Sequence, residues 1–145
     1  MRELTGNLWE VETDAVVITT NGVVRKDGCA VMGRGVAKQA AERMPRIAGI
    51  FGKALQVIGN HVINLGYSQT WGWIFSFPVK EHWRDTASLE LIERSARELV
   101  DAVDRYEFGT VALPRPGCGN GGLRWKDVRP VIEPLLDDRF VVVER

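Results

Sequence analysis

The chain contains little cysteine or histidine, no excess of charge and no long apolar run. Its 145 residues include two cysteines and two histidines, which excludes a disulfide framework and the closely spaced ligands of a zinc site. Nineteen basic residues balance nineteen acidic residues, so no overall field attracts the protein to nucleic acid or to anionic membranes. We therefore expect no metal and no other cofactor.

Membrane-directing segments are also missing. No apolar run approaches the roughly 20 residues of a membrane-spanning helix, and the first residues, Met1-Arg2-Glu3-Leu4, lack the apolar core of a signal peptide. We therefore expect a cytoplasmic protein without a membrane partner. The length and the absence of repeats or linkers predict one domain over residues 1–145, with a monomer as the default state.

Apolar periodicity predicts strands that alternate with helices. The predicted strands are 4–9, which is short and ends in a turn, 15–19, 61–65, 73–77, 110–113 and 140–143. The predicted helices are 36–44, 47–55, 89–103 and 125–136. Strands 61–65 and 73–77 are expected to pair antiparallel, and Pro134 is expected to bend or shorten the last helix. The charged side of helix 89–103, which includes Glu98, is expected to face water. The pattern predicts an α/β fold with three layers, α/β/α, and a mixed, mainly parallel central sheet.

Two glycine-rich segments each lie between a predicted strand and a predicted helix. They are Gly28 to Gly35 and Leu113 to Gly122, and the second has four glycines in its last six residues. Glycine lets successive amide N–H groups point into one concavity, and the following helix adds its positive end. Loops that follow parallel strands gather at one edge of the sheet. The pair predicts a phosphate or diphosphate site bound from two sides, unless the glycines only form tight turns.

Neither glycine segment matches a standard catalytic or nucleotide-binding motif. Gly28 to Gly33 has the glycine spacing of a nucleoside-triphosphatase loop, but the required Lys and Ser or Thr are replaced by Arg34 and Gly35. The third glycine of a dinucleotide fingerprint would fall on Lys38. Cys118 has no base near it in the sequence, so we interpret it as a packing residue. The sequence therefore predicts a phosphate site without a standard catalytic signature.

The two segments together resemble the ligand loops of the macrodomain family, a fold that binds ADP-ribose. The likeness extends from Gly6 to the last strand, and four motifs occur in the same order: Gly6-Asn7-Leu8, Met32-Gly33-Arg34-Gly35-Val36, Phe77-Pro78-Val79-Lys80 with His82-Trp83-Arg84, and Pro116 to Gly122. The sequence is most similar to the branch that contains terminal ADP-ribose protein glycohydrolase and the DNA ADP-ribosyl glycohydrolase antitoxins.

This resemblance implies the residues of an ADP-ribose site. It places Asn7 near the adenine and Asn21 by the distal ribose, and it includes their neighbours Leu8 and Thr20. The diphosphate is expected between two sets of residues, which are Met32, Gly33, Arg34, Gly35 and Val36 on one side and Pro116, Gly117, Cys118, Gly119, Asn120, Gly121 and Gly122 on the other.

Lys80 matches the lysine that this branch uses for catalysis. Cleavage of the bond to the target leaves an electron-poor ribose carbon, C1″, which is an aldehyde when the ring is open. A neutral amine can attack this carbon and form an imine. A charged ammonium can instead stabilise negative charge on the leaving group or on ribose oxygens. The sequence leaves both roles open, next to that of an ordinary solvated lysine.

The sequence departs from the protein-directed branch member at Gly121, where that protein has a catalytic aspartate. In this respect it resembles the DNA-directed antitoxins, whose target is ADP-ribosylated thymidine in single-stranded DNA. Trp71, Trp73 and Trp83 are candidates for stacking on bases, although Trp73 also fits a core position. A longer segment, Gly22 to Asp27, is a candidate rim or lid over the distal ribose.

The implied function is that of a mono-ADP-ribosyl glycohydrolase. Its substrate would be protein ADP-ribosylated on acidic residues, or ADP-ribosylated thymidine in single-stranded DNA, with ADP-ribose as ligand and product. A module that binds ADP-ribose without turnover is the alternative, supported by Gly121. A phosphatase acting on ADP-ribose 1″-phosphate is a third, weaker hypothesis.

Overall fold

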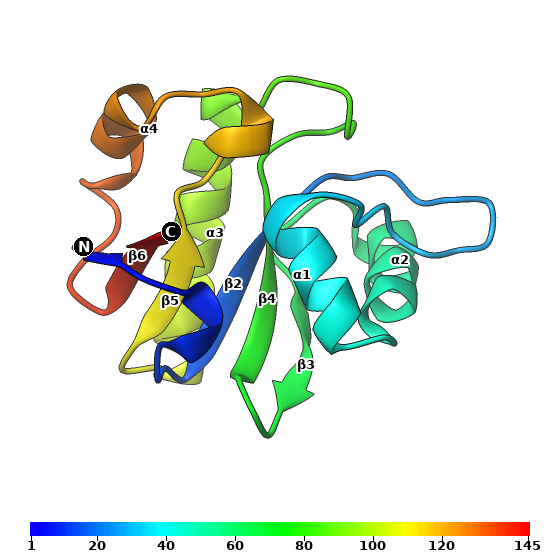
Figure 1. The fold of residues 1–145 in the computed structure, drawn as a ribbon, viewed down its shortest axis with the longest axis horizontal. Coiled ribbons are helices and arrows are strands. Elements are labelled where there is room, and N and C mark those ends of the chain that lie inside the picture. Colours follow the sequence, from blue (N-terminus) through cyan, green and yellow to red (C-terminus); the bar gives the residue numbers. More distant parts are fainter.

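The computed structural model describes residues 1–145 as one six-stranded sheet between two layers of helices (Figure 1). In chain order the elements are β1 (Arg2–Thr5), η1 (Leu8–Glu10), β2 (Ala15–Thr20), α1 (Gly35–Arg43), α2 (Ile47–Ile58), β3 (Asn64–Ser68), β4 (Gly72–Pro78), α3 (Leu89–Tyr106), β5 (Val111–Pro114), η2 (Gly119–Gly121), α4 (Trp125–Ile132) and β6 (Phe140–Glu144). The strand order is β1-β6-β5-β2-β4-β3, and every neighbouring pair is parallel except β3 with β4. The predicted mixed, mainly parallel α/β/α fold is confirmed.

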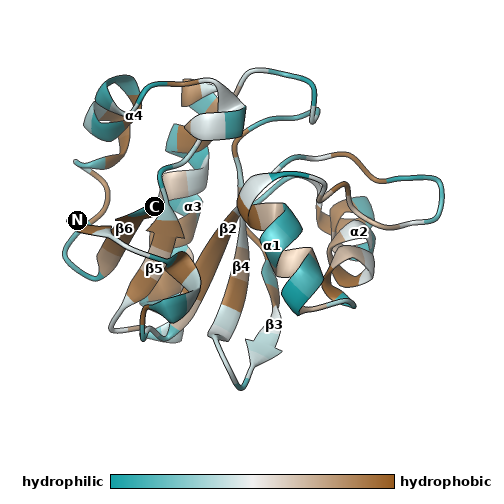
Figure 2. Ribbon diagram, in the orientation of Figure 1, coloured by the Kyte–Doolittle hydropathy of each residue, from teal (hydrophilic) through white to brown (hydrophobic).

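Two apolar cores lie on the two faces of the sheet. On β2, Ala15 and Val17 face the core that contains α3 and α4, whereas Val16 and Ile18 face the core that contains α1 and α2. Each of these four side chains is at most 1% exposed, and burial of a Val or Ile side chain contributes about 1.5–3 kcal/mol. Figure 2 shows the same arrangement, with apolar strands inside and polar residues on the outer surfaces of the helices. None of the helices combines the length and apolar character needed to cross a bilayer.

The predicted elements agree with the structure except near one polar side chain. Segment 4–9 is a short strand that ends in a turn, as expected: β1 ends at Thr5, and Asn7 Oδ1 accepts a hydrogen bond from Trp9 N at 3.0 Å and starts the 3-10 turn η1. β3 begins at Asn64 instead of 61, because Val62 N donates to Glu98 Oε1 at 2.9 Å before the strand pairing begins. α4 ends at Ile132, ahead of Pro134 as expected.

The parallel strands place their carboxyl ends at one edge of the sheet. The segments that follow these ends are 6–7 after β1, 21–34 after β2, 79–88 after β4 and 115–124 after β5. β6 also ends at this edge, close to the C-terminus (Figure 1). Ligands of open parallel sheets bind at this edge, and the candidate site is built from these segments.

Candidate functional site

The backbone amides from Met32 to Ala37 form one side of the site. None of them donates a hydrogen bond to another protein atom, whereas Val31 N donates to Val23 O at 3.1 Å and Lys38 N donates to Arg34 O at 3.2 Å. The first three amides precede α1 and the other three belong to its N-terminus, where the helix dipole adds positive partial charge. Unpaired amides at a helix N-terminus bind anions.

The glycine loop, defined here as residues 115–124, forms the opposite side. The loop folds back on itself, because Gly122 N donates to Gly119 O and Leu123 N donates to Gly117 O, both at 3.0 Å. Gly117 has a φ of 75°, and a Cβ there would come within 2.7 Å of Ile92 Cδ1, so no other residue fits. The amides of residues 119–121 have no acceptor in the protein.

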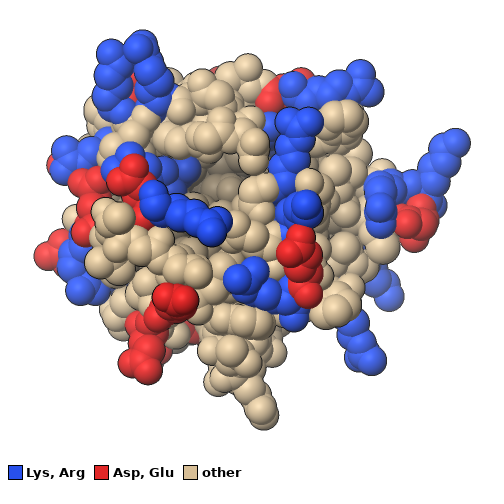
Figure 3. Space-filling model, in the orientation of Figure 1, with Lys and Arg blue, Asp and Glu red and all other residues tan.

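The two sides approach each other across a cleft. A Cβ built on Gly35 would be 3.1 Å from Asn120 Nδ2, so the start of α1 lies next to η2. The adjoining cleft has a volume of about 660 Å³, within the usual range for small-molecule sites. Its lining includes the predicted residues Asn7, Leu8, Val36, Cys118 and Gly119. Figure 3 shows the hollow in this face, with Lys and Arg side chains on both sides of it.

Several residues that line the cleft were not predicted from the sequence. Gln39 and Arg43 follow Val36 at helical spacing on one face of α1, so this spacing was a usable signal. Gln39 Oε1 accepts a hydrogen bond from Trp9 Nε1 at 2.9 Å. The other missed residues come from the ends of β5 and β6 and from α4, and only the fold brings them together; they are Pro114, Arg115, Trp125, Val143, Glu144 and Arg145.

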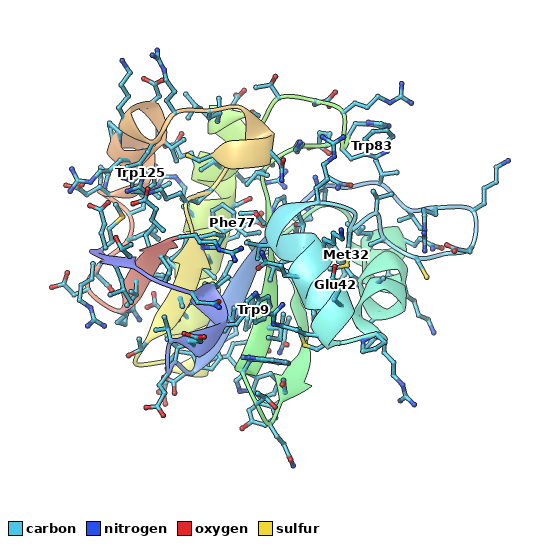
Figure 4. The ribbon with its side chains drawn as sticks, in the orientation of Figure 1. Trp9, Met32, Glu42, Phe77, Trp83 and Trp125 are labelled. Atoms are coloured by element: carbon cyan, nitrogen blue, oxygen red, sulfur yellow. The ribbon has the colours of Figure 1, made fainter.

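Arg115 links the glycine loop to the end of β6. Its Nη2 pairs with Glu144 Oε2 at 3.1 Å, and its guanidinium carbon lies 4.9 Å from the centre of the Trp125 ring. Trp9 and Trp125 come from separate elements on this side of the molecule, as the labelled side chains in Figure 4 show. The Arg115 side chain therefore connects the glycine loop, β6 and α4 in the lining of the cleft.

Lys80 reaches the glycine loop from the segment after β4. Its Nζ donates to Trp83 O at 3.1 Å and to Asn120 O at 3.4 Å. Both acceptors are neutral carbonyl oxygens, and no carboxylate pairs with the amine. Lys80 therefore brings an uncompensated cation to the loop that faces the unpaired amides of α1.

A polar network behind the sheet edge fixes the backbone at Lys80. Asn60 Nδ2 donates to Lys80 O at 3.2 Å and to Glu81 Oε2 at 3.1 Å. The Arg94 guanidinium donates to Asn60 O, and Arg94 Nε in turn pairs with Glu98 Oε2 at 3.5 Å. The expectation that Glu98 faces water is wrong, because its carboxylate binds three groups in this region.

Asn21 and Thr20 contribute to the fold next to the site. Asn21 Nδ2 donates to Val31 O at 3.1 Å and its Oδ1 accepts from Val23 N at 3.0 Å, so the side chain holds the start and end of segment 21–31 together. Thr20 Oγ1 is buried without a hydrogen-bond partner. Met32 has a buried side chain, 8% exposed, so only its backbone is available to a ligand.

Segment 22–31 is a short hairpin that packs against α2. Arg25 N donates to Cys29 O at 2.8 Å, and a Cβ on Gly52 of α2 would be 2.0 Å from Gly28 O. Figure 1 shows the tip of this hairpin beyond α2, away from the glycine loop. The tip therefore does not cover the glycine loop, whereas the base of the hairpin lies against the segment that carries Lys80, because Gly22 N donates to Glu81 O at 3.0 Å.

Two of the three candidate stacking tryptophans lie at the other end of the sheet. Trp71 and Trp73 are at the start of β4, where they pack against Trp9 at 5.5 Å and Tyr67 at 5.2 Å between ring centres. The suggestion that they stack on bases at the site is wrong. Trp83 is in the segment that carries Lys80 and is 41% exposed.

The environment of Cys118 disfavours its thiolate. Burial raises the pKa of the Cys118 thiol above its ordinary value of 9.0, and the nearby Arg115 opposes this shift only in part. Its Sγ lies 3.7 Å from Pro116 O. A raised pKa disfavours the thiolate that a nucleophile requires. No three His, Cys, Asp or Glu side chains are grouped as metal ligands.

Two known proteins with sequences similar to this chain have the same name. DNA ADP-ribosyl glycohydrolase of Thermus aquaticus is 34% identical over 142 residues, which cover 94% of this chain and 38% of that protein. The protein of the same name from Mycobacterium tuberculosis is 34% identical over 128 residues, which cover 85% of this chain and 35% of that protein. The chain thus spans little more than a third of the length of these relatives.

Solved structures agree with the sequence matches. The macrodomain of Thermus aquaticus DarG has a TM-score of 0.81 and 35% identity, covering 99% of this chain and 97% of the other. The macrodomain of Mycobacterium tuberculosis DarG has a TM-score of 0.80 and 29% identity over the same shares. The family model described as Macro domain matches residues 21–132. The chain belongs to the macro domain family.

Proposed function

We propose that this chain binds ADP-ribose in the cleft and acts as a mono-ADP-ribosyl glycohydrolase that releases ADP-ribose from a macromolecule. The observation that carries the proposal is the Lys80 amine, held by neutral carbonyls at the glycine loop that faces the unpaired amides of α1. The names of the relatives favour ADP-ribosylated DNA as the target. Thymidine in single-stranded DNA is the modified nucleoside that we propose.

The ligand position follows from the chemistry of the two sides. The diphosphate would lie between the amides of 32–37 and those of 119–121, since both sets have N–H groups without acceptors. The adenine would lie toward Asn7, whose Nδ2 has no partner in the protein. The distal ribose would then approach Lys80.

The hydrogen bonds of Lys80 favour the electrostatic role over the imine. An ammonium has three N–H donors, and two of them are used by Trp83 O and Asn120 O. The third can reach an oxygen of the ligand. Water would attack C1″, the bond from C1″ to the target atom would break with its electron pair on that atom, and a proton from the water would end on the target. Lys80 would stabilise the negative charge that develops.

A reader module without turnover is the second candidate, because of Gly121. A Cβ at Gly121 would come 3.0 Å from Ala87 Cβ, so an aspartate there would require the segment before α3 to shift by a few tenths of an ångström. The catalytic carboxylate of the protein-directed relatives therefore has no equivalent at this place. No feature of the site favours the third candidate, the phosphatase.

The test compares wild type with Lys80→Ala and with Lys53→Ala, which changes an exposed lysine on α2. Each protein is incubated with an oligonucleotide carrying ADP-ribosylated thymidine and with a protein ADP-ribosylated on acidic residues, and free ADP-ribose is measured. We expect release from the oligonucleotide, a loss of about 100-fold or more in Lys80→Ala, and no loss in Lys53→Ala.

Calorimetry with ADP-ribose separates the outcomes. Binding by wild type without release from either substrate supports the reader module. Equal rates for wild type and Lys80→Ala contradict the role of the lysine. Faster release from the protein substrate contradicts DNA as the target.

A further inference from the structure

Trp83 lies beside the reacting group of the proposed site. Its carbonyl accepts the hydrogen bond from Lys80 Nζ at 3.1 Å. The segment that carries both residues is tied down at each end, because Val79 N donates to Thr20 O at 3.0 Å and Ala87 N donates to Gly121 O at 2.8 Å. The position of Trp83 relative to the ligand loops is therefore fixed by the fold.

The Trp83 side chain points outward and stays accessible. It is 41% exposed, whereas Trp9 is 7% exposed and Trp71, Trp73 and Trp125 are half-buried against other elements. Figure 4 shows Trp83 at the outside of the molecule, on the segment between β4 and α3. A single exposed tryptophan is common on protein surfaces, so its meaning depends on its neighbours.

Arg84 places a cation beside the Trp83 ring. The guanidinium carbon of Arg84 lies 5.1 Å from the centre of the Trp83 ring, and this guanidinium forms neither a hydrogen bond nor an ion pair. Neither carboxylate of the segment pairs with it: Glu81 accepts from Asn60 Nδ2 at 3.1 Å and Asp85 accepts from His82 N at 3.3 Å. The surface beside Lys80 thus presents an unpaired guanidinium and a tryptophan ring that the His82 ring also contacts, at 5.2 Å between ring centres.

An aromatic ring with an adjacent guanidinium matches the chemistry of a nucleotide. Bases stack on tryptophan without regard to sequence, and arginine binds the phosphates between them. An acidic peptide would use the guanidinium but has no flat group to stack on the ring. The zero net charge of the chain makes a local contact of this kind necessary for DNA binding, since no general attraction exists.

We propose that Trp83 and Arg84 bind the nucleotide next to the ADP-ribosylated base in single-stranded DNA. This inference rests on the proposed function, and it adds that the enzyme recognises the polynucleotide and not only ADP-ribose. The ring stacks on the neighbouring base while the guanidinium contacts the phosphate between the two nucleotides.

The experiment compares two substrates that share the same glycosidic bond. One is ADP-ribosylated thymidine as a free nucleoside, and the other is the same nucleoside inside a single-stranded oligonucleotide. For Trp83→Ala we expect the loss of kcat/KM on the oligonucleotide to exceed the loss on the nucleoside by about tenfold. Trp83→Phe should restore most of the difference, because it keeps a stacking ring. Arg84→Ala should reduce the salt dependence of kcat/KM on the oligonucleotide, and it should leave that on the nucleoside unchanged.

Tyr67→Ala is the matched control, since Tyr67 is 63% exposed but lies on β3 at the other end of the sheet. This substitution should leave kcat/KM unchanged on both the nucleoside and the oligonucleotide. Equal effects of Trp83→Ala on nucleoside and oligonucleotide overturn the inference, as does a selective loss on an ADP-ribosylated peptide. If wild type releases ADP-ribose from neither substrate, the proposed function fails. The inference is then decided by anisotropy with the modified oligonucleotide: weaker binding by Trp83→Ala supports it, and equal binding overturns it.

Discussion

Asn60 is the residue that connects Lys80 to the rest of the fold. Its Nδ2 binds the carbonyl of Lys80 and the carboxylate of Glu81, and its own carbonyl accepts from Arg94. Asn60 does not reach the ligand loops through its side chain, so we assign it a positioning role. Without it, the Lys80 backbone would lose one hydrogen bond and the neighbouring Glu81 carboxylate another.

Asn60→Ala is expected to lower kcat about five- to tenfold, because a net hydrogen bond contributes about 0.5–1.5 kcal/mol. The affinity for ADP-ribose, measured by calorimetry, should change little. Asn64→Ala is the control, since Asn64 Nδ2 binds Tyr106 Oη at 2.8 Å far from the site. A parallel loss of kcat and affinity in Asn60→Ala, with a lower Tm, would show a merely structural role.

Cys118 gives a prediction that depends on pH. Burial raises the pKa of its thiol above 9.0, so the folded state favours the protonated form more than the unfolded chain does. This contribution to stability is present below the ordinary thiol pKa and is lost as pH rises through the folded value. In a Cys29→Ser background, the alkylation rate of Cys118 should rise with a midpoint above 9. A midpoint below 8 would indicate a reactive thiolate and contradict the packing role.

At the scale of elements, the local sequence was sufficient for most of the fold. Three features depend only on neighbouring residues, and each was predicted: the β-branched run of β2, the apolar face of α3 and the end of α4 before Pro134. The pairing of β1 with β6 depends on contacts between the two ends of the chain, and no local pattern encodes it. β3 began later than predicted for the same reason, since Glu98 of α3 holds the preceding residues.

The candidate site was predictable to a similar degree. Glycine content and the helix start of α1 predicted an anion site formed by two loops, and the cleft lies beside both. The contact of Lys80 with Asn120 joins residues that are 40 positions apart, so only the assembled sheet reveals it. The direction of the hairpin tip at 22–31 could not be predicted, because its contact with Gly52 is also a tertiary one.

α2 supplies a prediction with its own internal control. A Cβ on Gly52 would lie 2.0 Å from Gly28 O and 2.8 Å from Ala30 N, both backbone atoms that cannot move without the hairpin. Gly52→Ala should therefore lower stability by about 3 kcal/mol, seen as a lower Tm. Gly49 lies on the same helix with nothing within 4 Å of its Cβ position. Gly49→Ala should raise stability by about 0.5–1 kcal/mol, through helix propensity. Equal changes in the two variants would contradict the contact between α2 and the hairpin.

At the scale of the whole molecule, one edge of the sheet collects every feature assigned to function. The strands end there in parallel, so the start of α1, the segment after β4 and the glycine loop meet although they are far apart in the chain. Both cores lie behind this edge and keep the loops in place. Ligand binding at the edge should therefore stabilise the entire fold and not a single loop.

Thermal unfolding with ADP-ribose tests this coupling. At a ligand concentration 100 times Kd, binding adds about 2.7 kcal/mol, and for a chain of 145 residues we expect Tm to rise by about 8 °C. Gly33→Glu should abolish the rise, because its carboxylate would occupy the place of the diphosphate at the unpaired amides. The Cβ position of Gly33 has nothing within 4 Å, so the Tm without ligand should stay that of wild type. Gly33→Gln, similar in size but neutral, should keep part of the rise. A full rise in Gly33→Glu would mean that the anion does not lie at the start of α1.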